Sequence, residues 1–184
     1  MRAGRVCACC VASLLLGSPA FALGHSKKRS QIDAYCKQVQ ASFAEAVPFV
    51  FSGPDPWVEM DEVPAAMPDE ALAFVYTAGE EIRWVFLRIV DSENGWSEDV
   101  NYFFRTDGTI AKRMRELHSN RANIVLQVIT YYERRRVLKE SSHYRAFGPG
   151  PKHPSEFDDP DAPVFWNVDE LPFPEIPDLW RRLA

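Results

Sequence analysis

The sequence predicts an α+β fold: one N-terminal helix packed on a four- to six-stranded antiparallel β-meander, with a proline-rich acidic C-terminal tail docked on it. Three observations lead to this prediction. One stretch near the N-terminus has helical periodicity. Residues 69–148 contain no proline and alternate between strand-like segments and turns. Prolines return after residue 148, in a segment rich in acidic and aromatic residues.

The first 22 residues have the pattern of a secretory signal peptide. Arg2 and Arg5 give a basic start, residues 6–21 form an uncharged apolar run, and Ala20 and Ala22 place small residues where a signal peptidase cleaves. The run is about 16 residues, shorter than the roughly 20 that a spanning helix needs. We therefore expect cleavage after Ala22 and a periplasmic or secreted protein without a membrane-spanning segment. An uncleaved anchor is the alternative.

The sequence divides into a signal peptide (1–22), a helix-plus-sheet domain (23–147) and a tail (148–184). The part that follows the signal is long enough to bury a core of its own as one domain. Three of the four cysteines lie in the signal, so Cys36 cannot form an internal disulfide with any of them after cleavage. We expect a buried, unreactive Cys36 thiol, with a bridge to another chain as the alternative.

The helix is expected over residues 31–46. Ser30 can cap it, and Asp33 completes a capping-box pattern. Pro48 ends it, because the residue before a proline is disfavoured in the helical region. Four apolar residues recur at spacings of four, three and four, which puts them on one helical face: Ile32, Cys36, Val39 and Phe43.

The proline-free block predicts consecutive antiparallel strands. Asp107-Gly108 has the pattern of a type I′ hairpin turn, and Asn94-Gly95 and residues 120–123 mark further turns. Short loops between consecutive strands indicate a meander, and a small barrel plugged or flanked by the helix is the rival architecture. The expected strands cover 82–90, 100–106, 109–118, 124–132 and 136–147, with a further short strand at 72–77.

Charge is unevenly distributed along the chain. The net charge is −5, and two basic residues leave with the signal. Residues 45–98 carry two basic and twelve acidic residues, residues 99–147 ten basic and five acidic, and residues 148–184 three basic and eight acidic. The acidic total argues against non-specific nucleic-acid binding. The local contrast predicts that the tail meets the basic strands.

The tail is unusually aromatic for a proline-rich segment. Disordered tails are poor in aromatic residues, so we expect this one to dock on its own sheet, with Asp158, Asp159 and Asp161 facing the basic strands. The functional alternative is binding to another envelope protein. Its candidate contact residues are Phe165, Trp166 and Trp180.

The densest positive run is Arg134-Arg135-Arg136. Successive residues of a strand point to opposite faces, so the run fits best at a turn between the last two strands. It is a candidate site for an acidic partner, an anionic lipid headgroup or a polyanionic glycan. The alternative is a solvated turn that the acidic tail partly neutralises.

Aromatic residues also concentrate on neighbouring strands, at Trp84, Phe86, Tyr102 and Phe104. If they share a face away from the helix, they form an apolar ligand groove. The alternative is an ordinary sheet core, because aromatic cross-strand pairs stabilise sheets.

The sequence predicts no catalytic, metal or cofactor site. It has no nucleophile elbow and no glycine-rich phosphate loop. The histidines, at 25, 118, 143 and 153, do not lie at metal-ligand spacing on one element.

The leading functional hypothesis is therefore a non-catalytic envelope module that binds a protein partner. A carrier of a small apolar ligand or lipid, held in the sheet concavity, is the first alternative. A hydrolase with an unrecognised site is the second.

Overall fold

The computed structural model describes residues 19–43, 49–53, 58–60, 71–93, 95–149, 152, 157 and 163–173, with side chains from residue 26 onward. The predictions for residues 1–18, for Trp180 and for the acidic residues at 158, 159 and 161 lie outside the described residues.

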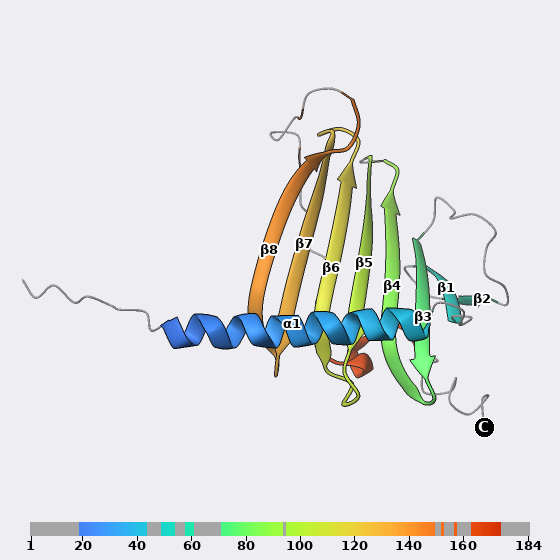
Figure 1. Cartoon of the computed structure of the whole chain (residues 1–184). Coiled ribbons are helices and arrows are strands. Elements are labelled where there is room, and N and C mark those ends of the chain that lie inside the picture. Colours follow the sequence, from blue (N-terminus) through green and yellow to red (C-terminus); the bar gives the residue numbers. More distant parts are fainter. Residues whose placement is uncertain are drawn as a thin grey trace, which may run out of the picture.

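One eight-stranded antiparallel sheet forms the body of the described chain (Figure 1). From β3 to β8 every strand pairs with the next strand in sequence, as expected for a meander, and β1 lies between β2 and β3. The strands are β1 (Phe49–Gly53), β2 (Val58–Met60), β3 (Ala71–Ala78), β4 (Glu81–Asp91), β5 (Trp96–Phe104), β6 (Ile110–Ser119), β7 (Ile124–Glu133) and β8 (Arg136–Ala146).

The expected four to six strands are too few, because β1 and β2 lie in the proline-rich stretch that the sequence analysis left without strands. Prolines are excluded from central strands, but they are tolerated at strand ends. Pro48 and Pro54 stand on either side of β1, which itself contains none. The density of prolines in this stretch therefore gave no indication of a five-residue strand, whose Val50 and Phe51 are both buried.

A single helix, α1 (Pro19–Ser42), begins earlier than the expected residue 31. Pro19 suits the first position of a helix because its fixed φ is helical and its missing N–H would be unpaired there. Ser30 is not a cap, since its hydroxyl donates to the carbonyl of Ser26 one turn earlier. Asp33 lies inside the helix and faces the sheet instead. No helix in the described part of the chain is long and apolar enough to span a membrane.

The helix crosses one end of the sheet, roughly perpendicular to the strands (Figure 1). The predicted apolar stripe faces the sheet: Cys36, Val39 and Phe43 pack with Phe103, against Trp84 and others. Burial raises the pKa of the Cys36 thiol to about 12, so the thiol stays protonated at neutral pH. The predicted buried Cys36 is confirmed.

Residues 163–173 pack on the opposite face of the sheet. Tyr102 points to this face, and its hydroxyl donates to the carbonyl of Pro163 at 2.9 Å. Leu171 and Phe173 belong to the same buried cluster, and the ring of Phe173 stacks on that of Phe51 with centroids 4.7 Å apart. This part of the tail therefore closes the main apolar core.

The Asp107-Gly108 hairpin forms, but its turn is not type I′. Only Gly108 has a positive φ, and its N–H donates to the carbonyl of Arg105 at 3.0 Å. This is a three-residue loop that ends in a left-handed glycine. Glycine is also needed for space, since a Cβ at Gly108 would lie 3.1 Å from Oδ1 of Asn167.

Candidate functional site

The predicted arginine run lies at the tip of the β7–β8 hairpin. Arg134 and Arg135 form its turn, with φ of 47° and 58°, and Arg136 is the first residue of β8. Two adjacent positive φ values are what a type I′ turn requires. The guanidinium of Arg135 pairs with the tail carboxylate of Glu170 at 2.7 Å. The tail thus neutralises one of the three arginines.

Two of the predicted aromatic contacts attach the tail to the sheet. The ring of Phe165 lies 5.3 Å from that of Tyr102, and Trp166 meets Tyr132 edge-on at 5.4 Å. The backbone N–H of Trp166 donates to the second carboxylate oxygen of Glu170, Oε2, at 2.8 Å. Trp166 and Arg135 are therefore brought together through one carboxylate. Both aromatic rings are partly buried, as parts of an internal contact.

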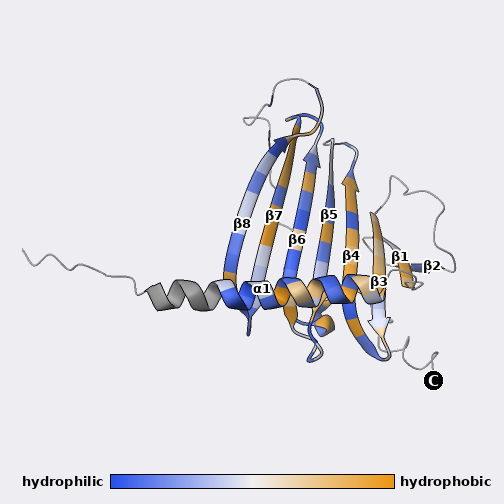
Figure 2. Ribbon diagram, in the orientation of Figure 1, coloured by the Kyte–Doolittle hydropathy of each residue, from blue (hydrophilic) through white to orange (hydrophobic). Residues whose placement is uncertain are grey.

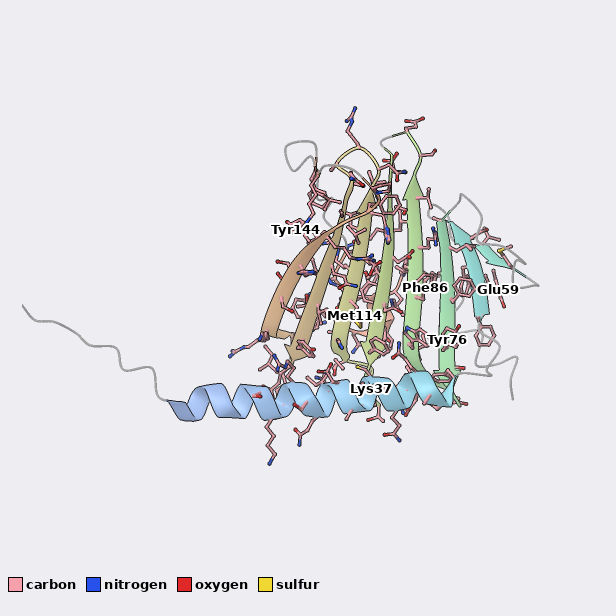
Figure 3. All side chains as sticks on the ribbon, turned by 45° about the horizontal axis from the view of Figure 1, so that its top comes forward. Lys37, Glu59, Tyr76, Phe86, Met114 and Tyr144 are labelled. Atoms are coloured by element: carbon pink, nitrogen blue, oxygen red, sulfur yellow. The ribbon has the colours of Figure 1, made fainter. Side chains whose placement is uncertain are left out.

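The four aromatic residues considered for a ligand groove do not share a face. Tyr102 and Phe104 are fully buried on the side of the tail, which makes them ordinary core. Trp84 packs beneath α1. Phe86 lies on the same side as α1 but beyond it (Figure 3), where it packs in a separate cluster and meets the ring of Phe74 at 5.8 Å. The predicted groove is therefore wrong.

An exposed edge strand is the feature that the sequence analysis missed. Within the described part of the chain, strand β8 pairs only with β7, and ten of its eleven residues are exposed; Leu138 alone is partly buried. Large apolar side chains are exposed on it or just after it: Val137 by 54%, Tyr144 by 50% and Phe147 by 47%. Figure 2 shows that β8 is otherwise largely hydrophilic.

Hydrogen bonding defines which backbone groups of β8 face outward. Phe147 donates its N–H to the carbonyl of Asn123, directly opposite in the β7–β8 register. Bonded and non-bonded pairs alternate along an antiparallel ladder. The N–H and C=O groups of Glu140, Ser142 and Tyr144 therefore point away from β7, toward the open edge.

A cleft of about 520 Å³ opens between α1 and the ends of the β5–β6 and β7–β8 hairpins. A neighbouring depression of about 510 Å³ continues from it and shares two of its lining residues. The cleft is lined by Lys28, Gln31, Ile32, Tyr35, Arg105, Thr106, Ala111, Tyr132, Glu133 and Leu138. The depression is lined by Lys28, Glu133, Arg134 and Arg136.

Positive charge dominates this corner. Lys28 pairs with Glu133 at 2.7 Å, and its hydrogen bond holds the pKa of that carboxyl below its usual range. Arg105 donates instead to neutral oxygens, among them the carbonyl of Tyr132 at 2.6 Å. Within the described residues, no carboxylate lies at ion-pair distance from Arg105, Arg134 or Arg136.

A charged network covers the part of the sheet face that α1 leaves open. Glu116 accepts from Gln127 at 2.6 Å and Arg145 at 2.5 Å, and His118 lies 3.2 Å from it. On the next strand, burial raises the pKa of Asp99, which lies 3.7 Å from Arg88. Among the described residues, no cluster of His, Cys, Asp and Glu side chains could hold a metal ion.

Comparisons with protein families, with curated proteins and with solved structures find no match for this chain.

Proposed function

We propose that this protein is an exported, non-catalytic module that binds a protein partner by adding a strand of that partner to β8. The observation that carries the proposal is the eleven-residue β8, exposed on both faces and, among the residues that the structure describes, unpaired along its outer side. An extended segment of a partner would gain main-chain hydrogen bonds with each outward-facing residue of the strand.

Sheet edges in proteins are normally protected against such pairing. Short strands, prolines, bulges and charged side chains are the usual means. The opposite edge follows this rule, because β2 has three residues. Strand β8 is long and contains no proline, so its protection is limited to charged side chains and to one departure from regular pairing, opposite Tyr131 and Tyr132. No strand in the described residues pairs with the outer side of its regular part, from Lys139 to Ala146.

The chemistry of β8 suggests the character of the partner strand. Arg136, Lys139 and Arg145 outnumber the single acidic residue, Glu140, whose carboxylate already accepts from Thr130. Tyr144 adds a half-exposed ring, which also meets the ring of Phe157 edge-on with centroids 5.7 Å apart. An acidic extended segment with an aliphatic or aromatic residue opposite Tyr144 complements this strand in charge and in apolar surface.

The test uses Ser142, whose N–H faces the open edge. Ser142→Pro removes that donor without removing a hydrogen bond to β7, whereas Ser142→Thr keeps it. A photoreactive phenylalanine analogue at Tyr144, in cells that produce the protein, is expected to cross-link one partner protein in the wild-type and Ser142→Thr backgrounds. The cross-link should disappear in Ser142→Pro.

Equal melting temperatures of the two variants would show that the sheet survives the substitution. A cross-link that persists in Ser142→Pro, or no cross-link from Tyr144 in any background, would contradict strand addition.

A further inference from the structure

We propose that the cleft between α1 and the two hairpins binds a single-chain amphiphile with an anionic headgroup. This inference goes beyond strand addition at β8, since the cleft is formed mainly by α1 and the hairpin ends.

The cleft has fixed walls, because α1 is attached to the sheet beside it. The hydroxyl of Tyr35 donates to the carbonyl of Phe104. One half-turn earlier, Asp33 accepts from Lys112 at 2.7 Å and from the hydroxyl of Tyr131 at 3.0 Å. These contacts hold the helix at a set distance from the strands. Preformed pockets bind small molecules with less ordering cost than surfaces that must open first.

The inner wall of the cleft is apolar. Ile32 comes from α1, Ala111 from β6 and Leu138 from β8, and Tyr35 adds to the lining. Ligand sites are typically 300–1,000 Å³ with a mostly apolar lining and a few placed polar groups, and the volume of about 520 Å³ falls within that range. Such a wall suits a hydrocarbon chain.

The mouth of the cleft is cationic. Lys28, Arg105, Arg134 and Arg136 surround it, and Glu133 is the one carboxylate among the lining residues. The Arg105 guanidinium is already oriented, because it donates to Thr109 Oγ1 and to the carbonyls of Ile110 and Tyr132. None of these acceptors neutralises its charge. An anionic headgroup at the mouth would supply the missing negative charge.

Apolar wall and cationic mouth together select an amphiphile rather than a plain hydrocarbon or a free anion. The shared chemistry is one acyl chain that ends in a carboxylate or a phosphate. A fatty acid and a lysophospholipid both have it, and binding experiments distinguish them.

The first experiment is a fluorescence titration of the full mature protein with three probes of equal chain length: palmitate, palmitoyl-lysophosphatidylglycerol and neutral monopalmitin, each below its aggregation concentration. We expect at least one anionic probe to bind about tenfold more tightly than monopalmitin, with the difference shrinking in high salt. Palmitate as the tighter ligand would identify a carboxylate site, and the lysophospholipid a phosphate site.

Variants locate the binding. The double variant Arg134→Gln, Arg136→Gln should bind the anionic probe about tenfold more weakly than the wild type. Arg121→Gln removes one positive charge in the exposed turn between β6 and β7, away from the cleft, and as a control it should leave binding unchanged. Ile32→Trp should fill the cleft and abolish binding of every probe.

Equal affinities for monopalmitin and both anionic probes would overturn the proposal. So would a loss of affinity in Arg121→Gln as large as in the double variant, or unchanged binding by a folded Ile32→Trp protein. Absence of binding by all three probes would overturn it as well. None of these outcomes bears on cross-linking from Tyr144, so the two proposals fail independently.

Discussion

Two adjacent arginines with positive φ form the turn between β7 and β8. A non-glycine residue in the left-handed region costs about 1–2 kcal/mol, because its Cβ approaches the following carbonyl oxygen. Asn-Gly is the pair that type I′ turns favour. The chain instead has two arginines there, beside a cationic cleft. Strained backbone conformations in proteins cluster at binding and active sites, so this position agrees with a binding role for the turn.

Replacing this turn tests whether the two arginines are kept at a cost in stability. Arg134→Asn with Arg135→Gly should stabilise the protein by about 1–2 kcal/mol. It removes only the exposed Arg135–Glu170 pair, worth less than about 1 kcal/mol. Urea denaturation at pH 7 measures the change, and a destabilised variant would show that the arginines are there for stability.

We predict that the ionised Asp99 side chain destabilises the folded protein at neutral pH. Burial raises its pKa in the folded state, so the charged form is disfavoured by folding, and this cost disappears as pH falls through the folded pKa toward the unfolded value. Asp99→Asn should therefore match or exceed wild-type stability at pH 7, by up to about 1 kcal/mol, with a smaller gain near pH 4. Melting temperatures across this range would reveal it, and a gain that grows at low pH would contradict it.

At the scale of elements, α1 is attached to the sheet by its apolar face and by two ion pairs, of which Lys112–Asp33 is less exposed than Lys28–Glu133. The Lys112 side chain is 10% exposed and Asp33 is 34% exposed, and their charged atoms lie 2.7 Å apart. Losing the carboxylate leaves a nearly buried ammonium ion, whereas losing the ammonium leaves a carboxylate that still reaches water.

These exposures predict an asymmetric response to substitution. Asp33→Ala should cost about 2–3 kcal/mol, whereas Lys112→Met, which fills the same space with an apolar chain, should cost less than about 1 kcal/mol. The double variant should recover most of the loss. Chemical denaturation of the three variants would measure this, and equal costs for the two single variants would contradict the account.

Sequence periodicity was sufficient for some elements and not for others. The spacing of Cys36, Val39 and Phe43 correctly predicted which face of the helix packs, because helical geometry is local. Alternation likewise located the strands from β3 to β8. The start of α1 was missed because Ser30 looks like a cap but bonds back to Ser26. Order within a sheet depends on long-range pairing, so nothing local marked β8 as an edge.

The candidate site illustrates the same limit. The arginine run was correctly expected at a turn, because consecutive strand residues cannot share a face. Its proximity to Lys28 and to Arg105 brings together three distant parts of the chain, and no spacing rule connects them. The aromatic groove failed because Phe86 and Tyr102 lie on opposite faces of the sheet.

At the scale of the whole molecule, the two faces of the sheet are covered by different ends of the chain. Helix α1 covers one end of one face, and residues 163–173 close the core on the other. Packing of residues 163–173 on the sheet is therefore part of the fold of the described chain. Full burial of a Leu or Phe side chain contributes about 1.5–3 kcal/mol, and the tail contributes both Leu171 and Phe173 to the core.

Truncation tests this contribution. A chain that ends at Gly148 should lose about 3–5 kcal/mol of stability and melt at a lower temperature. A chain that ends at Phe173 is the control, because it keeps the segment that packs on the core. An unchanged melting temperature after truncation at Gly148 would show that the tail does not stabilise its own sheet.

The central claim is that β8 is the site for a partner strand, and native mass spectrometry of the protein purified from its own cells tests it most directly. We predict a complex with one additional protein chain for the wild-type and Ser142→Thr proteins, and the single chain of residues 23–184 for Ser142→Pro. A single chain in all three samples, or the same complex in all three, would contradict the claim.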